Sequence, residues 1–314
     1  MINFRYHVVS LTAVFLALAI GLVVGTAALN GPVADTLKDR VDALSKDNSN
    51  YREQANQYRE ELSRTQEFAT EVSPALLNGK LTGHKILVVV LPSGQDYADG
   101  ISSMLKVAGA TITGTVTVQD KFFDPANGRE LLDLADKASR PSVSVDGLPL
   151  NSDGVETSSA LLAVALLQRP ATVTPATVTP ADLTAVLAAY SEAGYLAVSD
   201  DVVPGAEATV VVSGLPPVDR DATKKNQNAV MLTAQFGMDR PLVVGGNGIG
   251  DGNLVSEIRA DPTLVKKIST VDNASTEQGQ LATAMTVVER VIGGKIGQYG
   301  LSAGATSQVP KAAG

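Results

Sequence analysis

The chain has 314 residues, of which 44% are hydrophobic and 18% are charged, and its formal net charge is -8. This length accommodates a membrane segment, a spacer and one or two globular domains, and the acidic balance argues against nucleic acid, whose phosphates favour a basic protein face. The absence of cysteine excludes disulfide bonds and thiolate chemistry.

The first predicted element is an apolar helix at the amino terminus. No charged residue occurs from Val8 to Leu29, and a helix of ~22 residues is ~33 Å long, enough to cross a hydrocarbon core of ~30 Å. This run exceeds the ~7–15 apolar residues of a cleavable signal. We therefore predict that residues 1–31 form an uncleaved signal anchor, with a signal cleaved between Gly25 and Ala28 as the alternative. A large domain that follows such a start is expected outside the cytoplasm.

Residues 32–75 are predicted to form a coiled-coil helix. Pro32 suits the first turn of a helix, and apolar residues then follow a heptad repeat, a sustained signal that is typical of a coiled coil. The seam of this homo-oligomer is expected at Leu37, Val41, Leu44, Asn48, Tyr51, Tyr58 and Leu62. Asn48 would fix the register at some cost in stability. A single helix that lies on its own domain is the alternative interpretation.

From residue 80 to residue 300 the pattern predicts one α/β globular domain. Continuous apolar strands alternate with helices, which indicates a parallel sheet covered on both faces. We predict a three-layer, doubly wound, mostly parallel sheet, whose strand order a single sequence does not determine. Strands are expected in KILVVVLPSG, in TITGTVTV and over 195–199, 208–213, 241–246 and 268–272, and helices over 97–110, 128–139, 156–168, 181–193, 222–237, 252–260 and 275–293. The repeat ATVTPATVTP at 171–180 is expected to be an extended connector, and residues 301–314 a flexible tail.

The sequence offers no catalytic constellation. His84 is the one histidine after the predicted span, and at ~3.3 Å per strand residue it stands ~30 Å from Ser93, whereas a nucleophile and its base must approach within ~3.2 Å. The glycines of GGNGIGDG fit no register of the dinucleotide-binding fingerprint, and no phosphate-binding loop occurs. The methionines are scattered, unlike the clustered ligands of a soft-metal site. We therefore predict no enzyme activity, no cofactor and no dedicated metal site.

Two glycine-containing loops nevertheless follow predicted strands, at the edge where open α/β sheets bind ligands. They define a candidate cleft for a ligand or a partner, with ordinary turns as the alternative interpretation. The cleft residues are Pro92, Ser93, Gly94, Gly245, Gly246 and Asn247.

Four features together resemble the actinobacterial channel-forming copper transporter family. They are MINFRYHVVSLTAVFLALAIGLVVG, the heptad region, KILVVVLPSG and STVDNASTEQGQLATAMTVVERVIGGKIGQYG. The resemblance covers essentially the whole chain and includes no catalytic or metal-ligand motif. It implies a channel-forming protein of the cell envelope, assigned to the outer membrane, that exports copper ions and keeps intracellular copper low. Related proteins resemble coiled-coil envelope proteins that act with a membrane partner to control septal peptidoglycan hydrolysis.

Two principal hypotheses about function follow. In the first, an oligomer of the N-terminal helices forms a pore through which copper leaves. In the second, an anchored coiled coil presents the α/β domain to an envelope protein partner. A ligand-binding sensor built on the two glycine loops is a third interpretation. Residue chemistry alone ranks the scaffold first, and the resemblance gives transport at least equal weight.

Overall fold

The structure is a computed structural model that describes residues 4–30, 32–139, 148–149, 153–168, 178–248, 250 and 252–311. The chain divides into two compact units, Met1–Arg64 and Thr65–Gly314. The greater part of the predicted connector, residues 171–177, lies outside the described residues.

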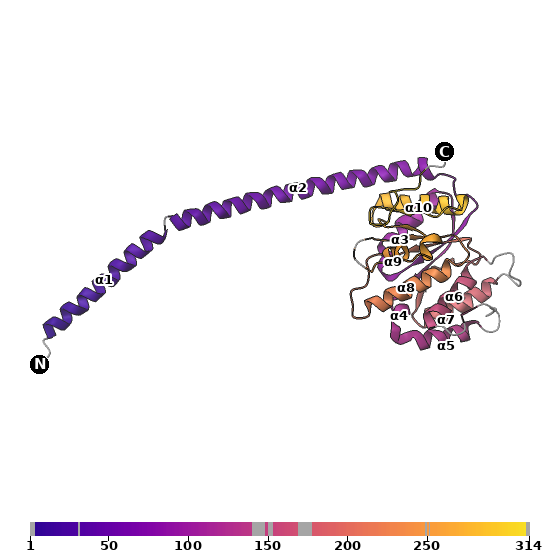
Figure 1. The fold of residues 1–314 in the computed structure, drawn as a ribbon, viewed down its shortest axis with the longest axis horizontal. Coiled ribbons are helices and arrows are strands. Elements are labelled where there is room, and N and C mark those ends of the chain that lie inside the picture. The colour runs from indigo at the N-terminus through magenta and orange to yellow at the C-terminus, as the bar shows by residue number, and fades with distance from the viewer. Residues whose placement is uncertain are drawn as a thin grey trace. The chain divides into compact units, whose positions relative to one another are not determined.

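The first unit consists of helix α1, Phe4–Asn30, and the larger part of helix α2, Pro32–Leu77 (Figure 1). Helix α1 has no polar face, and the hydroxyl groups of Thr12 and Thr26 donate to carbonyl groups of the preceding turn. Among the described residues, one helix is long and apolar enough to cross a membrane, over Phe4–Ala27. This finding agrees with the predicted N-terminal span in length and composition.

The second unit contains a seven-stranded sheet with the order β3-β2-β1-β4-β5-β6-β7. The strands are β1 Lys85–Val90, β2 Thr111–Val118, β3 Leu196–Val198, β4 Ala208–Val212, β5 Leu242–Gly245, β6 Ser269–Val271 and β7 Gln298–Tyr299. All neighbouring strands are parallel except β2 and β3, which are antiparallel. The predicted class, α/β with one N-terminal apolar helix and a mostly parallel sheet, is confirmed. Strand β7 was not predicted, because a strand of two residues carries no hydrophobic period.

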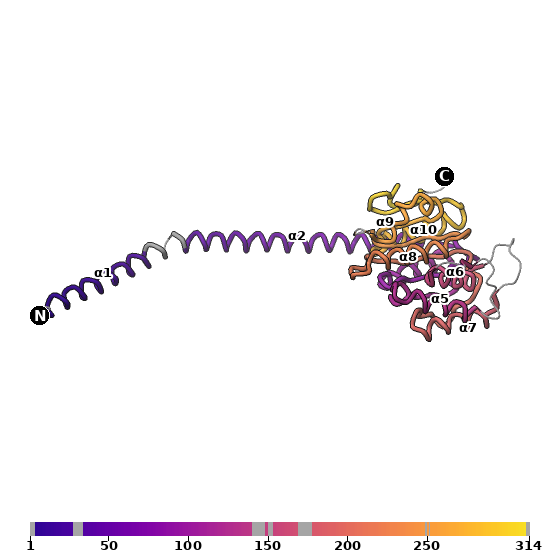
Figure 2. The backbone as a smooth tube through the Cα atoms, turned by 60° about the horizontal axis from the view of Figure 1, so that its bottom comes forward, coloured from indigo at the N-terminus to yellow at the C-terminus, as the bar shows by residue number. Residues whose placement is uncertain are grey.

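Helices cover both faces of this sheet, as the continuous apolar strands predicted (Figure 1). Side chains of β1 alternate, so that Ile86 and Val88 pack on one face and Leu87 and Val89 on the other. The first face carries α3, Gln95–Val107, α10, Glu277–Gly293, and the end of α2, where Ala69 and Leu77 are buried. The other face carries α4 Asp120–Phe123, α5 Gly128–Ser139, α6 Gly154–Leu166, α7 Pro180–Glu192, α8 Ala222–Phe236 and α9 Leu254–Ala260. Helices α5, α6 and α7 pack against one another (Figure 2).

The strand order places a topological switch point between β1 and β4. The chain leaves β1 towards β2 on one side, whereas β4 and the later strands continue on the other side. Loops that follow such a pair of strands diverge at their carboxyl ends, and the crevice between them is the usual ligand site of an open α/β sheet. A ligand site is therefore expected between the loops that follow Val90 and Val212.

Candidate functional site

A pocket of about 230 Å³ lies at the carboxyl ends of β1 and β4. Its walls come from the loops after β1 and β4, together with helices α4, α8 and α9. The lining residues are Leu91, Pro92, Ser93, Asp120, Phe123, Ser213, Gly214, Leu215, Pro216, Pro217, Val218, Lys225, Asn226, Ala229 and Leu254. Its position at the switch point and its mainly apolar walls are those of a small-molecule site.

Close backbone contacts fix the floor of this pocket. The backbone N–H of Gly214 donates to Ser93 Oγ at 3.0 Å. A Cβ atom added at Gly214 would collide with the carbonyl oxygen of Ser93, and one added at Gly94 would collide with that of Val212. Glycine is therefore required at both positions, and the loops after β1 and β4 form one preformed surface.

An ion-pair cluster joins two of the pocket walls. Lys225 Nζ lies 2.7 Å from Asp120 Oδ2 and 2.6 Å from Asp219 Oδ2, which links α8 to the start of α4 and to the loop after β4. These hydrogen bonds, first that of Asp120 and then that of Asp219, raise the pKa of Lys225. The hydrogen bond from Lys225 lowers the pKa of Asp219. The ammonium charge is thus already matched by two carboxylates.

The structure brings some of the predicted cleft residues together and separates others. Pro92 and Ser93 line the pocket, and Gly94 packs beneath it against β4. Gly245, the last residue of β5, and Gly246 lie outside the lining. The Gly245 carbonyl accepts from Ser213 N at 2.9 Å, and Gly246 N donates to the carbonyl of Val271. Asn247 is buried and forms a bridge with Asn273.

Sequence reasoning missed the residues that complete the pocket. Lys225 and Asn226 lie near the start of the helix predicted over 222–237, and Asp120 lies 105 residues before its partner Lys225. The Leu215–Val218 stretch carried the one local signal, a Pro-Pro pair directly after a strand. The strand order was needed to bring these segments together.

His84 and Ser93 lie at opposite ends of β1. His84 precedes the strand and its Nδ1 lies 3.0 Å from Glu207 Oε2, whereas Ser93 follows the strand and lines the pocket. Glu207 Oε1 also accepts from the backbone N–H of Lys85 at 3.0 Å. His84 is therefore a partner of Glu207 at the amino end of the sheet and gives Ser93 no general base.

The described residues include no group of three or more His, Cys, Asp or Glu side chains that could hold a metal ion. Met104 is buried in the core and Met238 is 51% exposed on the surface.

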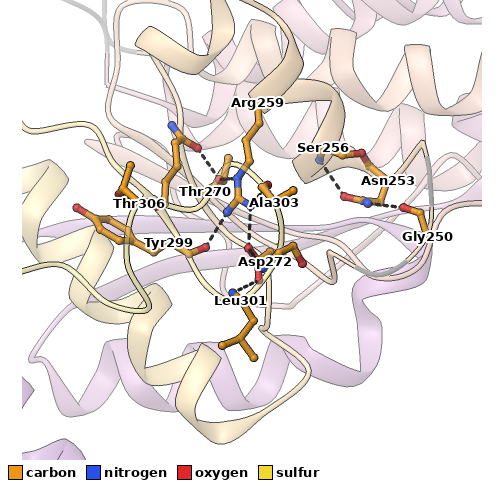
Figure 3. Close-up of polar contacts among 12 residues, drawn as sticks. Gly250, Asn253, Ser256, Arg259, Thr270, Asp272, Tyr299, Leu301, Ala303 and Thr306 are labelled. Atoms are coloured by element: carbon orange, nitrogen blue, oxygen red, sulfur yellow. Dashed lines mark hydrogen bonds and ion pairs between the residues drawn. The ribbon is translucent and has the colours of Figure 1, made fainter.

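A second polar cluster centres on Arg259, and Figure 3 shows it pointing from α9 towards the loop after β6. Arg259 Nη1 lies 2.7 Å from Asp272 Oδ2, Nε donates to Thr270 Oγ1 at 2.9 Å, and Nη2 donates to the Tyr299 carbonyl at 2.7 Å. Asp272 Oδ1 also accepts from the backbone N–H of Leu301 at 2.7 Å. The two charged side chains are 6% and 0% exposed. We call these residues the Arg259 clasp. It joins α9 and the end of β6 to β7 and to the start of the C-terminal segment.

The predicted seam residues of α2 are exposed in the single chain. Leu37, Leu44 and Tyr58 are 62%, 68% and 69% exposed, and Val41, Tyr51 and Leu62 are also exposed. A row of large apolar side chains at heptad spacing is unusual on a solvent-facing helix, because burying them against a partner removes apolar surface from water.

Comparison with known proteins decides the family. A sequence model described as "Copper transport outer membrane protein, MctB" matches residues 1–310. The chain belongs to the MctB family. Proteins named Copper transporter MctB from Mycobacterium tuberculosis H37Rv and Mycobacterium bovis are each 29% identical to it over 316 residues, which cover 98% of both chains. The protein of the same name from Mycobacterium leprae is 29% identical over 318 residues, again 98% of both. The match therefore includes the apolar helix, α2 and the α/β unit together, and the resemblance inferred from the sequence is confirmed.

Proposed function

We propose that this chain is a membrane-anchored, non-enzymatic protein of the cell envelope that acts in copper efflux as a homo-oligomer and so keeps intracellular copper low. The observation that carries the proposal is the family match over residues 1–310, because it covers the apolar helix, α2 and the α/β unit together. The family description also supports placement in the outer membrane. The globular unit is proposed to lie outside the cytoplasm.

Two features support assembly of several copies. The exposed seam of α2 offers Leu37 and Leu44 at d positions and Val41 at an a position, the pattern of a parallel coiled coil. In the apolar helix, Gly21 and Gly25 are four residues apart on one face, with nothing within 4 Å of an added Cβ atom at either. That spacing lets membrane helices approach closely.

The route proposed for copper runs between copies. A single span encloses no path, whereas several spans gathered by α2 can surround one. A water-filled path needs no metal ligands, which is consistent with the lack of a ligand cluster in the described part of the single chain. We therefore propose that the channel passes copper ions without coordinating them in a dedicated site.

The exposed seam and the preformed pocket favour a second candidate function. In it, the coiled coil is a scaffold that presents the α/β unit to an envelope protein partner, for example in the control of septal peptidoglycan hydrolysis. This role needs the anchor and the seam but no conduction.

One variant pair tests the oligomer on which both functions depend. Leu44→Asp places a charge at a d position, and Ala43→Asp places the same charge one residue away, off the seam. Burial of one leucine contributes ~1.5–3 kcal/mol, so a dimer with two copies of Leu44→Asp should lose ~3–6 kcal/mol and associate ~10²–10⁴-fold more weakly. Sedimentation of the full chain in detergent measures this directly. Equal sedimentation of both variants would contradict the seam.

The copper content of cells distinguishes transport from the scaffold role. Cells that lack the protein are expected to accumulate copper, and wild type and Ala43→Asp should restore low copper while Leu44→Asp should not. Purified wild type should also conduct ions in a planar bilayer. Normal copper in the deletion strain, together with no conductance, would reject transport and leave the scaffold role.

A further inference from the structure

We propose that the pocket at the carboxyl ends of β1 and β4 binds a small, neutral, mainly apolar molecule that carries an amide group, and that Asn226 recognises this amide. The inference is independent of copper transport, because it concerns the α/β unit alone. It rests on the polar groups that the pocket leaves without partners, on its apolar walls and on the balance of its charges.

Asn226 is the first of these polar groups. It lines the pocket and is 9% exposed, and within the described residues its side-chain amide has no hydrogen-bond partner. Asn228, two residues further along the same helix, is 1% exposed and donates Nδ2 to the Phe123 carbonyl at 2.9 Å. The Asn226 amide remains accessible from the pocket, whereas Asn228 Oδ1 is buried without a hydrogen-bond partner in the described part of the chain. A ligand in the pocket can therefore supply a donor and an acceptor to the accessible amide of Asn226.

Of the two serines in the pocket floor, Ser93 offers the hydroxyl group that a ligand can reach. Ser213 lines the pocket but its Oγ is buried against Gly246, where an added Cβ would meet it at 2.6 Å, so this hydroxyl is closed to a ligand. Ser93 Oγ accepts from Gly214 N, which leaves its own O–H available to donate. Hydroxyl groups and a carboxamide both donate and accept, so they match an amide better than a group that only accepts.

The remaining walls define the body of the ligand. Phe123, Pro216, Ala229 and Leu254 present apolar surface. A cavity of ~150 Å³ with apolar walls accommodates benzene, and this pocket measures about 230 Å³. The space therefore suits an aromatic or branched aliphatic group with a short polar arm.

The charges of the pocket argue for a neutral ligand. Among the described lining residues the one cation is Lys225, and its ammonium group is already held by Asp120 and Asp219. An anionic ligand would have to compete with two carboxylates for the same group. A cationic ligand would have to compete with Lys225 for them.

The test uses 3-phenylpropanamide as the probe and 4-phenylbutan-2-one, in which a methyl group replaces the amide nitrogen, as the matched control. Hydrogen exchange of the full chain in nanodiscs, followed by mass spectrometry, locates the binding site. The amide is expected to protect the segment from Ser213 to Lys225 saturably, with a dissociation constant in the millimolar range typical of a small fragment. The ketone, which lacks the donor, should bind ~10-fold more weakly.

Two variants on one helix assign the recognition to Asn226. Asn226→Leu should remove the tenfold preference for the amide while the protein melts close to the wild-type temperature, since no side-chain hydrogen bond of the described residues is lost. Asn228→Leu removes the Nδ2 hydrogen bond and leaves the Phe123 carbonyl without this donor, so it should lower the melting temperature and leave the preference unchanged. Equal affinity of wild type for the two probes, protection outside the pocket loops, or a preference that survives Asn226→Leu would overturn the proposal.

Discussion

Replacing Arg259 by methionine should destabilise the α/β unit by ~3 kcal/mol. Breaking a buried ion pair from one side costs ~3–5 kcal/mol, because the remaining charge stays uncompensated. The Asp272 carboxylate would still accept hydrogen bonds from the backbone N–H groups of Leu301 and Ser302, so we expect the lower end of this range. The Tyr299 carbonyl and Thr270 Oγ1 would also lose a donor.

Calorimetry of the full chain measures this effect. A change of ~3 kcal/mol in a unit of this size corresponds to a melting temperature lower by ~6–12 °C. Arg129→Met, at an exposed position of the same unit, is the matched control and should leave the transition unchanged. Hydrogen exchange should also show that the segment after Gln298 loses protection in Arg259→Met. A loss below ~1 kcal/mol, or one equal to that of Arg129→Met, would refute the view that the clasp holds the C-terminal segment.

Two further predictions concern an acidic group and a glycine. Because the hydrogen bond from Lys225 lowers the pKa of Asp219 in the folded state, its contribution to stability is present above the unfolded pKa of ~3.9 and is lost as the pH falls through the folded value. Asp219→Asn should therefore flatten the fall in stability below pH ~4 in urea unfolding, and an unchanged pH profile would contradict this. Gly300 has a φ of 122°, and an added Cβ would collide with the Asp272 carboxylate, so Gly300→Ala should cost more than ~1 kcal/mol. A melting temperature equal to that of wild type would count against the tight packing of this turn.

The sequence predicted the regular elements because their apolar patterns are local. The expected strand at 268–272 corresponds to β6, and the expected helix at 222–237 to α8. Small errors occur at helix starts. The helix expected from 275 begins at Glu277, because Thr276 is its N-cap and its side chain accepts from Gly279 N. The antiparallel direction of β3 and the strand order depend on contacts between distant segments, which one sequence does not reveal.

The sequence predicted only the part of the candidate site that follows local patterns. Pro92 and Ser93 follow a strand, so the rule that ligands bind at the carboxyl ends of strands was sufficient to find them. Asn226 lies within a helix among other polar residues, and no local pattern distinguishes it from Asn228. The difference between the two appears only when α8 is packed on the sheet, where Asn228 meets the Phe123 carbonyl and Asn226 faces the pocket.

The number of copies decides between the two proposed functions. Leucine at d with a β-branched residue at a favours two strands, and an asparagine at an a position such as Asn48 commonly specifies a dimer. Two membrane helices in contact through Gly21 and Gly25 enclose no lumen, so a strict dimer cannot conduct ions through α1. Transport through the N-terminal helices therefore requires an assembly larger than the one that Val41, Leu44 and Asn48 favour, whereas the scaffold role requires nothing beyond the dimer. A measured mass of two chains for the conducting species would force the copper path away from α1.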